Sequence, residues 1–309
     1  MKPIRLRDFF EDKDGCLYAV SAYDNETKAG GVLRYAPDEE GERTSPEGIK
    51  YKKYDFEPAF EYIRKYKPEY LDVVHRVPLD DIKRVIKPEA EVDNIAQRDS
   101  RVKKLLKIFD VPKGKAGCTG SLLLGLENDA SDIDMVVYGK YWFLAQKNLI
   151  AATKKGEASP LSEELWKKVY NKRIPEIDYE TFILHEKRKW NRGEIDGTYF
   201  DLLYTRDYED LNRITVNKGR VTGKMEIEAV VTDASFSFDS PAIYSVDHEE
   251  ISKVLSFTHT YSGQALEGEL IKACGYVEEH GDEKWLIIGS TREAKGEYII
   301  SKTLVENGE

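Results

Sequence analysis

Two aspartates one residue apart, Asp132 and Asp134, have the spacing in this chain that points most directly to chemistry. On an extended strand, side chains at positions i and i+2 point to the same side, so these two carboxylates are expected to lie close together. Neighbouring carboxylates repel each other unless a cation lies between them. Because hard divalent ions such as Mg²⁺ prefer oxygen ligands, the pair predicts a metal site. The alternative is a solvated surface turn before the apolar residues 135–138.

A Gly-Ser pair, Gly120 and Ser121, precedes the aspartates by a spacer of ten residues. The backbone N–H groups of such a turn, together with the serine hydroxyl, suit phosphate oxygens. Ser121 also fits the N-cap of a helix, and the two roles coincide because a helix N-terminus attracts phosphate. Metal and phosphate ligands this close in sequence predict chemistry on a nucleoside triphosphate.

Residues 120–139 resemble the nucleotidyltransferase superfamily related to DNA polymerase beta, whose signature is Gly-Ser, a short spacer and Asp-x-Asp on a strand. Minimal members often show a form like GSxxRGxxxxxSDxD, and the chain matches it further at Gly125 and Ser131. Leu124 stands where that pattern has arginine, a departure that concerns the contact of the arginine and not the metal site. The superfamily resemblance covers residues 92–207. The whole chain also looks like a group of archaeal predicted nucleotidyltransferases.

The resembled superfamily uses a third carboxylate on a neighbouring strand, and Asp201 within the apolar run TYFDLLYT is the best candidate. A charged side chain in a buried strand is costly unless a metal ion or another partner compensates it. The alternative is that Asp201 points outward from an edge strand. Glu194 and Asp196 are reserve candidates, although the sequence IDG is typical of a surface turn.

The resemblance implies a two-metal site for Mg²⁺ or Mn²⁺, formed by the catalytic residues Asp132, Asp134 and Asp201. The expected nucleotide-binding residues are Gly120, Ser121, Ser131 and Lys115. The implied activity is template-independent transfer of a nucleoside monophosphate from a nucleoside triphosphate, such as ATP, to an acceptor hydroxyl, with release of pyrophosphate. The acceptor is an RNA end, a protein hydroxyl or a small molecule. The alternative function is a catalytically inactive nucleotide- or RNA-binding protein that retains the fold.

The distribution of charge leaves the RNA hypothesis open. A net charge of −10 argues against a surface coated with phosphate-binding residues. Residues 98–115 nevertheless carry seven Lys or Arg against two Asp, and residues 187–192 form a second basic run around Trp190. Cations there fit the steering of a triphosphate, and Trp190 fits stacking on a base. Both runs also fit solvated helix faces and helix ends.

Composition predicts a cytoplasmic protein in a reducing compartment. No apolar run approaches the roughly 18 residues that span a membrane, and the first residues lack the apolar segment of a secretory signal. Three cysteines, Cys16, Cys118 and Cys274, are far apart and predict neither disulfides nor a zinc site. Abundant Glu and Lys favour a thermophilic source. The oligomeric state is open.

The predicted fold class is α+β: a nucleotidyltransferase-fold mixed sheet with helices, flanked by a small α+β unit and a small β-barrel. The expected domains are an N-terminal α+β unit at 1–90, the catalytic domain at 91–210 and an OB-like β-barrel at 211–309. The apolar patterns predict strands at 115–119, 133–138 and 199–204, and a strand hairpin within 16–36. Helices are predicted at 57–66, 79–86, 93–109, 141–152, 162–170 and 179–190.

Overall fold

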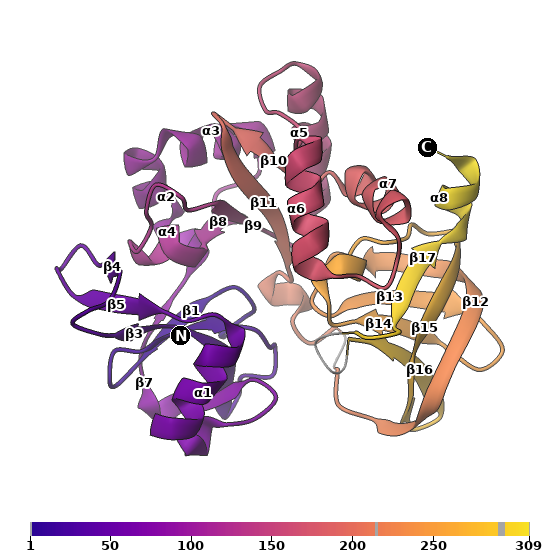
Figure 1. Ribbon diagram of the computed structural model, residues 1–309, viewed down its shortest axis with the longest axis horizontal. Coiled ribbons are helices and arrows are strands. Elements are labelled where there is room, and N and C mark those ends of the chain that lie inside the picture. Colours follow the sequence, from indigo (N-terminus) through magenta and orange to yellow (C-terminus); the bar gives the residue numbers. More distant parts are fainter. Residues whose placement is uncertain (1, 214–215, 290–293, 309) are drawn as a thin grey trace. The chain divides into compact units, whose positions relative to one another are not determined.

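The computed structural model describes residues 2–213, 216–289 and 294–308, which form helices and several β-sheets in a mixed α+β arrangement. The α+β fold class is therefore confirmed. The chain divides into two compact units, one of residues 1–160 with 191–213 and the other of residues 161–190 with 214–309 (Figure 1). Among the described helices, none has the length and apolar character that crossing a membrane requires.

The first unit begins with an antiparallel sheet of strand order β4-β5-β3-β2-β1-β7, in which β6 also pairs with β3. Helix α1 packs on this sheet through Ala59, Phe60 and Ile63. The predicted hairpin is confirmed as β2 and β3, and the predicted helix at 57–66 as α1. The bounds are β1 Phe9–Asp12, β2 Leu17–Val20, β3 Lys28–Pro37, β4 Arg43–Thr44, β5 Lys50–Lys53, α1 Phe56–Tyr66, β6 His75–Pro78 and β7 Ile82–Ile86.

The helix predicted at 79–86 is wrong. The segment forms a short 3₁₀ turn, Leu79–Asp81, followed by strand β7, which pairs antiparallel with β1. Its β-branched residues Ile82, Val85 and Ile86 favour a strand, and the neighbouring β1 supplies hydrogen bonds that a short helix would have to form alone.

A second sheet of the first unit has strand order β10-β11-β9-β8. In it β9 lies between β8, which is antiparallel to it, and β11, which is parallel. Apart from Asp134, the residues of β9 are buried, so this strand is the core of the sheet. The predicted strands at 115–119, 133–138 and 199–204 are confirmed. The bounds are β8 Ala116–Thr119, β9 Ile133–Tyr138, β10 Arg192–Ile195 and β11 Thr198–Thr205.

The helix predicted at 93–109 is two helices, α2 and α3. Asp99 ends α2 and, in an extended conformation, accepts a hydrogen bond from the backbone N–H of Arg101 at the start of α3. Aspartate is a preferred N-cap residue, which explains the break. Helices of this unit are α2 Pro88–Arg98, α3 Ser100–Phe109, α4 Gly120–Leu124 and α5 Tyr141–Lys154, with short 3₁₀ turns at Pro68–Tyr70 and Tyr208–Asp210.

The second unit contains a sheet of strand order β12-β13-β14-β16-β15-β17. Strand β12 pairs with β13 and also with β15, so that β12, β13, β14, β16 and β15 form a closed series of paired strands. The predicted helices at 162–170 and 179–190 are α6 and α7, which fold with this unit. Its elements are α6 Glu163–Arg173, α7 Tyr179–Lys189, β12 Arg220–Phe236, β13 Ala242–Asp247, β14 Lys253–Ser256, a 3₁₀ turn His259–Tyr261, β15 Leu270–His280, β16 Glu283–Ile288, β17 Tyr298–Ser301 and α8 Lys302–Asn307.

Candidate functional site

Strands β9 and β11 bring Asp134 and Asp201 side by side. The two residues are direct partners in the parallel pairing of these strands, and Thr119 of β8 is the partner of Asp134 on the other side. Paired residues on adjacent strands point to the same face, with the strands about 4.8 Å apart. The sheet therefore places both carboxylates on one face, and Asp132 precedes the same strand by one residue.

The acids interact electrostatically. Desolvation, followed by the negative charges of Asp132 and Asp201, raises the pKa of Asp134 to about 7, whereas Arg7 and Arg34 act to lower it. Charges act in this way only on groups that are close in space. The three acids thus share one neighbourhood, and an added cation would relieve their repulsion.

Gly120 lies against the carboxylate of Asp134. It follows β8 directly and has a φ of +70°, and a Cβ atom at this position would lie 2.6 Å from Oδ2 of Asp134. Ser121 comes next, partly exposed in the first turn of α4, whose Leu122 and Leu123 are buried. The predicted neighbourhood of the Gly-Ser pair and the aspartates is therefore present in the structure.

Asp201 has protein partners of its own. Its Oδ1 accepts a hydrogen bond of 3.0 Å from the Tyr199 hydroxyl and lies 3.5 Å from Nε of Arg192. The Arg192 side chain is 4% exposed and that of Asp201 21%. Asp201 points into a partly buried polar environment in which its charge is compensated by an arginine.

The reserve acids lie elsewhere. Asp196 occupies the turn between β10 and β11 with a φ of +49° and forms an exposed ion pair with Lys104. Glu194 lies in β10, where its backbone forms a bridge with Ser159. The structure therefore does not bring these two acids to Asp134 by strand pairing, as it does Asp201.

Ser131 is used within the loop that leads to β9. Its hydroxyl donates to Oδ1 of Asn128 and accepts from the Asn128 N–H, at 3.1 and 2.9 Å. Nη1 of Arg43 lies 3.4 Å from the same hydroxyl and 2.9 Å from the carbonyl oxygen of Leu126. These contacts hold the loop that precedes the aspartates in place. The Ser131 hydroxyl is therefore engaged in hydrogen bonds within this loop.

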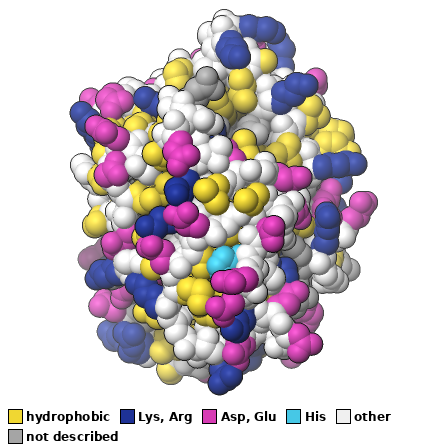
Figure 2. Space-filling view, turned by 90° about the vertical axis from the view of Figure 1, so that its right-hand side faces the viewer, with side chains coloured by type: hydrophobic (Ala, Val, Ile, Leu, Met, Phe, Trp, Pro, Cys, Tyr) yellow, Lys and Arg dark blue, Asp and Glu magenta, His cyan; other side chains and the backbone are white. Residues whose placement is uncertain are grey.

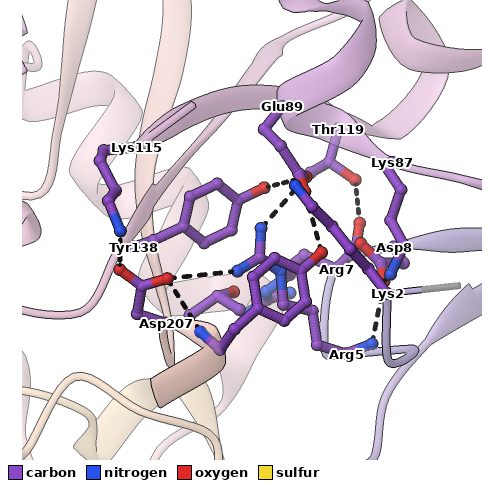
Figure 3. A network of polar contacts seen from close by, with 12 residues as sticks. Lys2, Arg5, Arg7, Asp8, Lys87, Glu89, Lys115, Thr119, Tyr138 and Asp207 are labelled. Carbon is purple, nitrogen blue, oxygen red and sulfur yellow. Dashed lines mark hydrogen bonds and ion pairs between the residues drawn. The ribbon is translucent and has the colours of Figure 1, made fainter. Parts of the chain in front are cut away.

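Lys115 is separated from the Gly-Ser pair by the whole of β8. It directly precedes the strand, whereas Gly120 directly follows it, so about 16 Å of extended chain lie between them. Its ammonium group pairs with Asp207 (Figure 3). The structure does not bring Lys115 to the acids.

Lys115 belongs to a largely buried ionic network that was not predicted from the sequence (Figure 3). Its centre is Arg5, 1% exposed, whose guanidinium lies 3.5 Å from the ring centre of Tyr138 and 3.9 Å from that of Tyr208. Arg5 also pairs with Glu89 at 3.1 Å. The network ties the start of the chain to the end of β9, and no local pattern in the sequence signals it.

The basic runs are engaged with acids. In the first run, Lys113 pairs with Asp93 at 2.9 Å and Arg98 pairs with Glu127. In the second run, the buried Lys189 pairs with Glu186. Figure 2 likewise shows acidic and basic side chains interspersed over the face that it presents. These contacts agree with the interpretation of the runs as helix faces and helix ends.

Within the described residues, no group of three or more His, Cys, Asp or Glu side chains has an arrangement that could hold a metal ion. The donor set of Asp132, Asp134 and Asp201 consists only of carboxylate oxygens, which is the chemistry that Mg²⁺ and Mn²⁺ prefer.

Comparison with known proteins finds a relative that aligns with nearly the whole chain. The chain is 35% identical over an alignment of 337 residues to "Uncharacterized protein MJ1086" of Methanocaldococcus jannaschii, covering 97% of this chain and 99% of that protein. The chain belongs to the family of MJ1086. No family model matches the chain. No solved structure matches it either. The similarity to MJ1086 therefore extends over both units, and the name of that protein assigns no activity to the family.

Proposed function

We propose that the chain is a metal-dependent nucleotidyltransferase of the superfamily related to DNA polymerase beta. The observation that carries the proposal is the pairing of Asp134 with Asp201, 67 residues further along the chain, with Gly120 lying against the Asp134 carboxylate. A Gly-Ser turn next to paired carboxylates suits a triphosphate and its metal ions.

The fold supports the proposal in its order of strands. The antiparallel pair β8 and β9 carries the Gly-Ser turn and Asp134, and the parallel strand β11 adds Asp201. We assign this sheet to the nucleotidyltransferase fold. The pairings of the second unit, which return from β15 to β12, agree with a small barrel of the OB-like kind.

The chemistry of the three acids suits a divalent metal ion. Asp132 and Asp134 would hold it, and Asp201 would join them from β11. When bound, two such ions would stabilise the attacking and the leaving oxygen in the transfer of the nucleoside monophosphate. The chain itself contributes the pairing that fixes Asp134 next to Asp201 and the glycine that leaves room beside the Asp134 carboxylate.

An RNA end is one acceptor, and a protein hydroxyl or a small molecule is the other class. The paired basic runs and the net charge of −10 favour the second class. Salt dependence distinguishes them, because several phosphate contacts make the affinity for RNA fall steeply as the salt concentration rises.

The ion pair between Arg192 and Asp201 favours a second function, namely nucleotide binding without turnover. A cation from the protein then takes the place of one metal ion, as in a binding protein that retains the fold. Binding of a nucleoside triphosphate without release of pyrophosphate would support this second function.

The test is incubation of the full chain with each of the four labelled nucleoside triphosphates and Mg²⁺ or Mn²⁺, with and without RNA. We expect pyrophosphate release by the wild type and none by Asp134→Asn. Asp129→Asn is the matched control, because Asp129 is an exposed residue of the loop that leads into β9. Transfer by Asp134→Asn at the wild-type rate would contradict the proposal.

A further inference from the structure

A β-bulge in β3 gives Arg34 an unusual position. Leu17 of β2 pairs with Tyr35, and the next residue, Tyr18, pairs with Leu33, so Arg34 is the extra residue between them. Bulges of this kind interrupt the alternation of side chains and direct one of them to a new place.

The burial of its neighbours shows the effect of the bulge. Leu33 and Tyr35 would share a face in a regular strand, because they are two residues apart. Instead Leu33 packs in the core beneath α1, together with Phe10, whereas Tyr35 packs in a separate cluster with Leu126. The side chains of β3 therefore switch sides of the sheet at Arg34.

Arg34 lies on the side of the carboxylates. Burial raises the pKa of Tyr35, Arg43 and Arg34 act to lower it, and Asp134 and Asp132 act to raise it. Arg34 acts in the same direction on the pKa of Asp134, for which burial is again the largest cause. The Arg34 charge therefore acts on both groups, and Tyr35, its neighbour in β3, packs with Leu126 of the loop that leads to the aspartates.

The guanidinium of Arg34 has no protein partner within residues 2–213, 216–289 and 294–308: it forms neither a hydrogen bond nor an ion pair there. It is nevertheless only partly exposed. A partly buried cation without a partner is costly, so a site for an anion is the physical explanation of its position.

The motif position that lacks arginine lies in the same region. Leu124 packs against the cluster formed by Leu17, Tyr35, Tyr51 and Leu126. The N-terminal sheet therefore covers this position with apolar side chains. Through Arg43, the same sheet also holds the carbonyl oxygen of Leu126, two residues further along the chain.

We propose that Arg34 binds the phosphate groups of the nucleotide and supplies the positive charge that Leu124 cannot. The N-terminal sheet is then part of the nucleotide site, and Arg43 positions the loop that carries the aspartates. The inference rests on the proposed function for the identity of the ligand. Arginine suits the role because its planar fork of donors matches phosphate oxygens.

The test measures binding without turnover, by calorimetry with Mg²⁺ and ATP in which a methylene group replaces the α–β bridging oxygen. AMP is the comparison ligand. For Arg34→Gln we expect the dissociation constant of the triphosphate analogue to rise about 10- to 100-fold, the range for a lost charge-assisted hydrogen bond. The dissociation constant of AMP should rise less than that of the triphosphate analogue. Arg34→Lys keeps the positive charge but not the planar pair of donors, so its affinity for the analogue should lie between those of the wild type and Arg34→Gln.

Lys28→Gln is the matched control, because Lys28 is an exposed cation at the other end of β3. Equal affinity of the wild type and Arg34→Gln for the analogue would overturn the inference. If the wild type then still releases pyrophosphate, the proposed function is unaffected. If the analogue binds in a way that depends on Arg34 but the wild type releases no pyrophosphate, the inference is supported and the proposed transferase activity is contradicted. A wild type that binds no nucleotide overturns both.

Discussion

Gly120 lies against the carboxylate of Asp134: a Cβ atom at Gly120 would be 2.6 Å from Oδ2, so the carboxylate would have to move to admit a side chain. The backbone at Gly120 also has a φ of +70°, which L-residues rarely adopt. Steric and conformational requirements for glycine thus coincide at the point where the turn meets the carboxylate. The close approach links the position of the turn to that of Asp134.

Gly120→Ala should therefore lower both stability and metal binding. We expect about 1–2 kcal/mol of destabilisation from the left-handed backbone alone, plus a displacement of the Asp134 carboxylate. Gly114→Ala is the control, because Gly114 has a φ of +80° and nothing within 4 Å of its Cβ position. Urea denaturation with and without Mg²⁺ measures both effects. The same loss of stability in the two variants, with Mg²⁺ stabilising both alike, would show that the contact with Asp134 is unimportant.

Asp134→Asn should stabilise the protein in the absence of metal. The pKa of Asp134 is raised from 3.8 to about 7, so the folded state holds the proton more tightly than the unfolded state. Stability is then greatest below the unfolded pKa and falls as the pH rises towards 7. The variant removes this loss, and we expect a gain of about 1–3 kcal/mol at pH 8 that shrinks towards pH 5.

Asp201→Asn provides the contrast, because Asp201 pairs with the buried Arg192. The variant removes the negative charge that lies 3.5 Å from a buried guanidinium, so it should lose stability at pH 8. Denaturation curves of both variants at pH 5 and pH 8, in a chelator, make the comparison. A loss of stability in Asp134→Asn equal to that in Asp201→Asn would contradict the repulsion between the three acids.

The sequence predicted those parts of the site that depend on local spacing. Gly120, Asp132 and Asp134 lie on one short segment that runs from the end of β8 through α4 into β9, and the apolar run around Asp201 identified the neighbouring strand. Lys115 was chosen for its nearness in sequence to Gly120, but an extended strand places residues before and after it at opposite ends. Arg34 could not be found in this way, because its position depends on the register between β2 and β3.

His185 should make the second unit less stable below pH 6.5. Burial lowers its pKa from 6.5 to about 4, and the nearby Lys189 and Arg188 act in the same direction. The neutral ring is built into the fold, since Nε2 accepts from the Ser301 N–H at 3.0 Å and Nδ1 lies 2.7 Å from the Thr181 carbonyl oxygen.

The unfolded state therefore binds a proton between pH 6.5 and 4 that the folded state excludes, and stability falls as the pH drops through this window. We expect His185 to contribute a loss of about 2 kcal/mol at pH 5 relative to pH 8. Denaturation of the wild type and of His185→Gln at both pH values measures it. The partly exposed His248 serves as the control position in His248→Gln, which should keep the wild-type slope. An unchanged slope in His185→Gln would refute the assignment.

Arg5 should be among the most sensitive positions of the first unit, although it lies next to the N-terminus. Its guanidinium is enclosed between Tyr138 and Tyr208, and the Glu89 carboxylate that it pairs with is also buried (Figure 3). Removing one member of a buried pair costs about 3–5 kcal/mol, because the other charge stays without compensation. Arg5→Met should show a loss of this size in urea denaturation.

Lys2→Met is the matched control, since Lys2 also pairs with Glu89 but at 3.8 Å and with a side chain that is 65% exposed. A surface pair of this kind contributes at most about 1 kcal/mol. The double variant Arg5→Met with Glu89→Gln separates charge from packing. If the uncompensated Glu89 charge causes the loss, the second substitution restores part of the stability. If instead the double variant is less stable than Arg5→Met by the full cost of Glu89→Gln in the wild-type background, the stacking of Arg5 on the two tyrosines is the larger contribution.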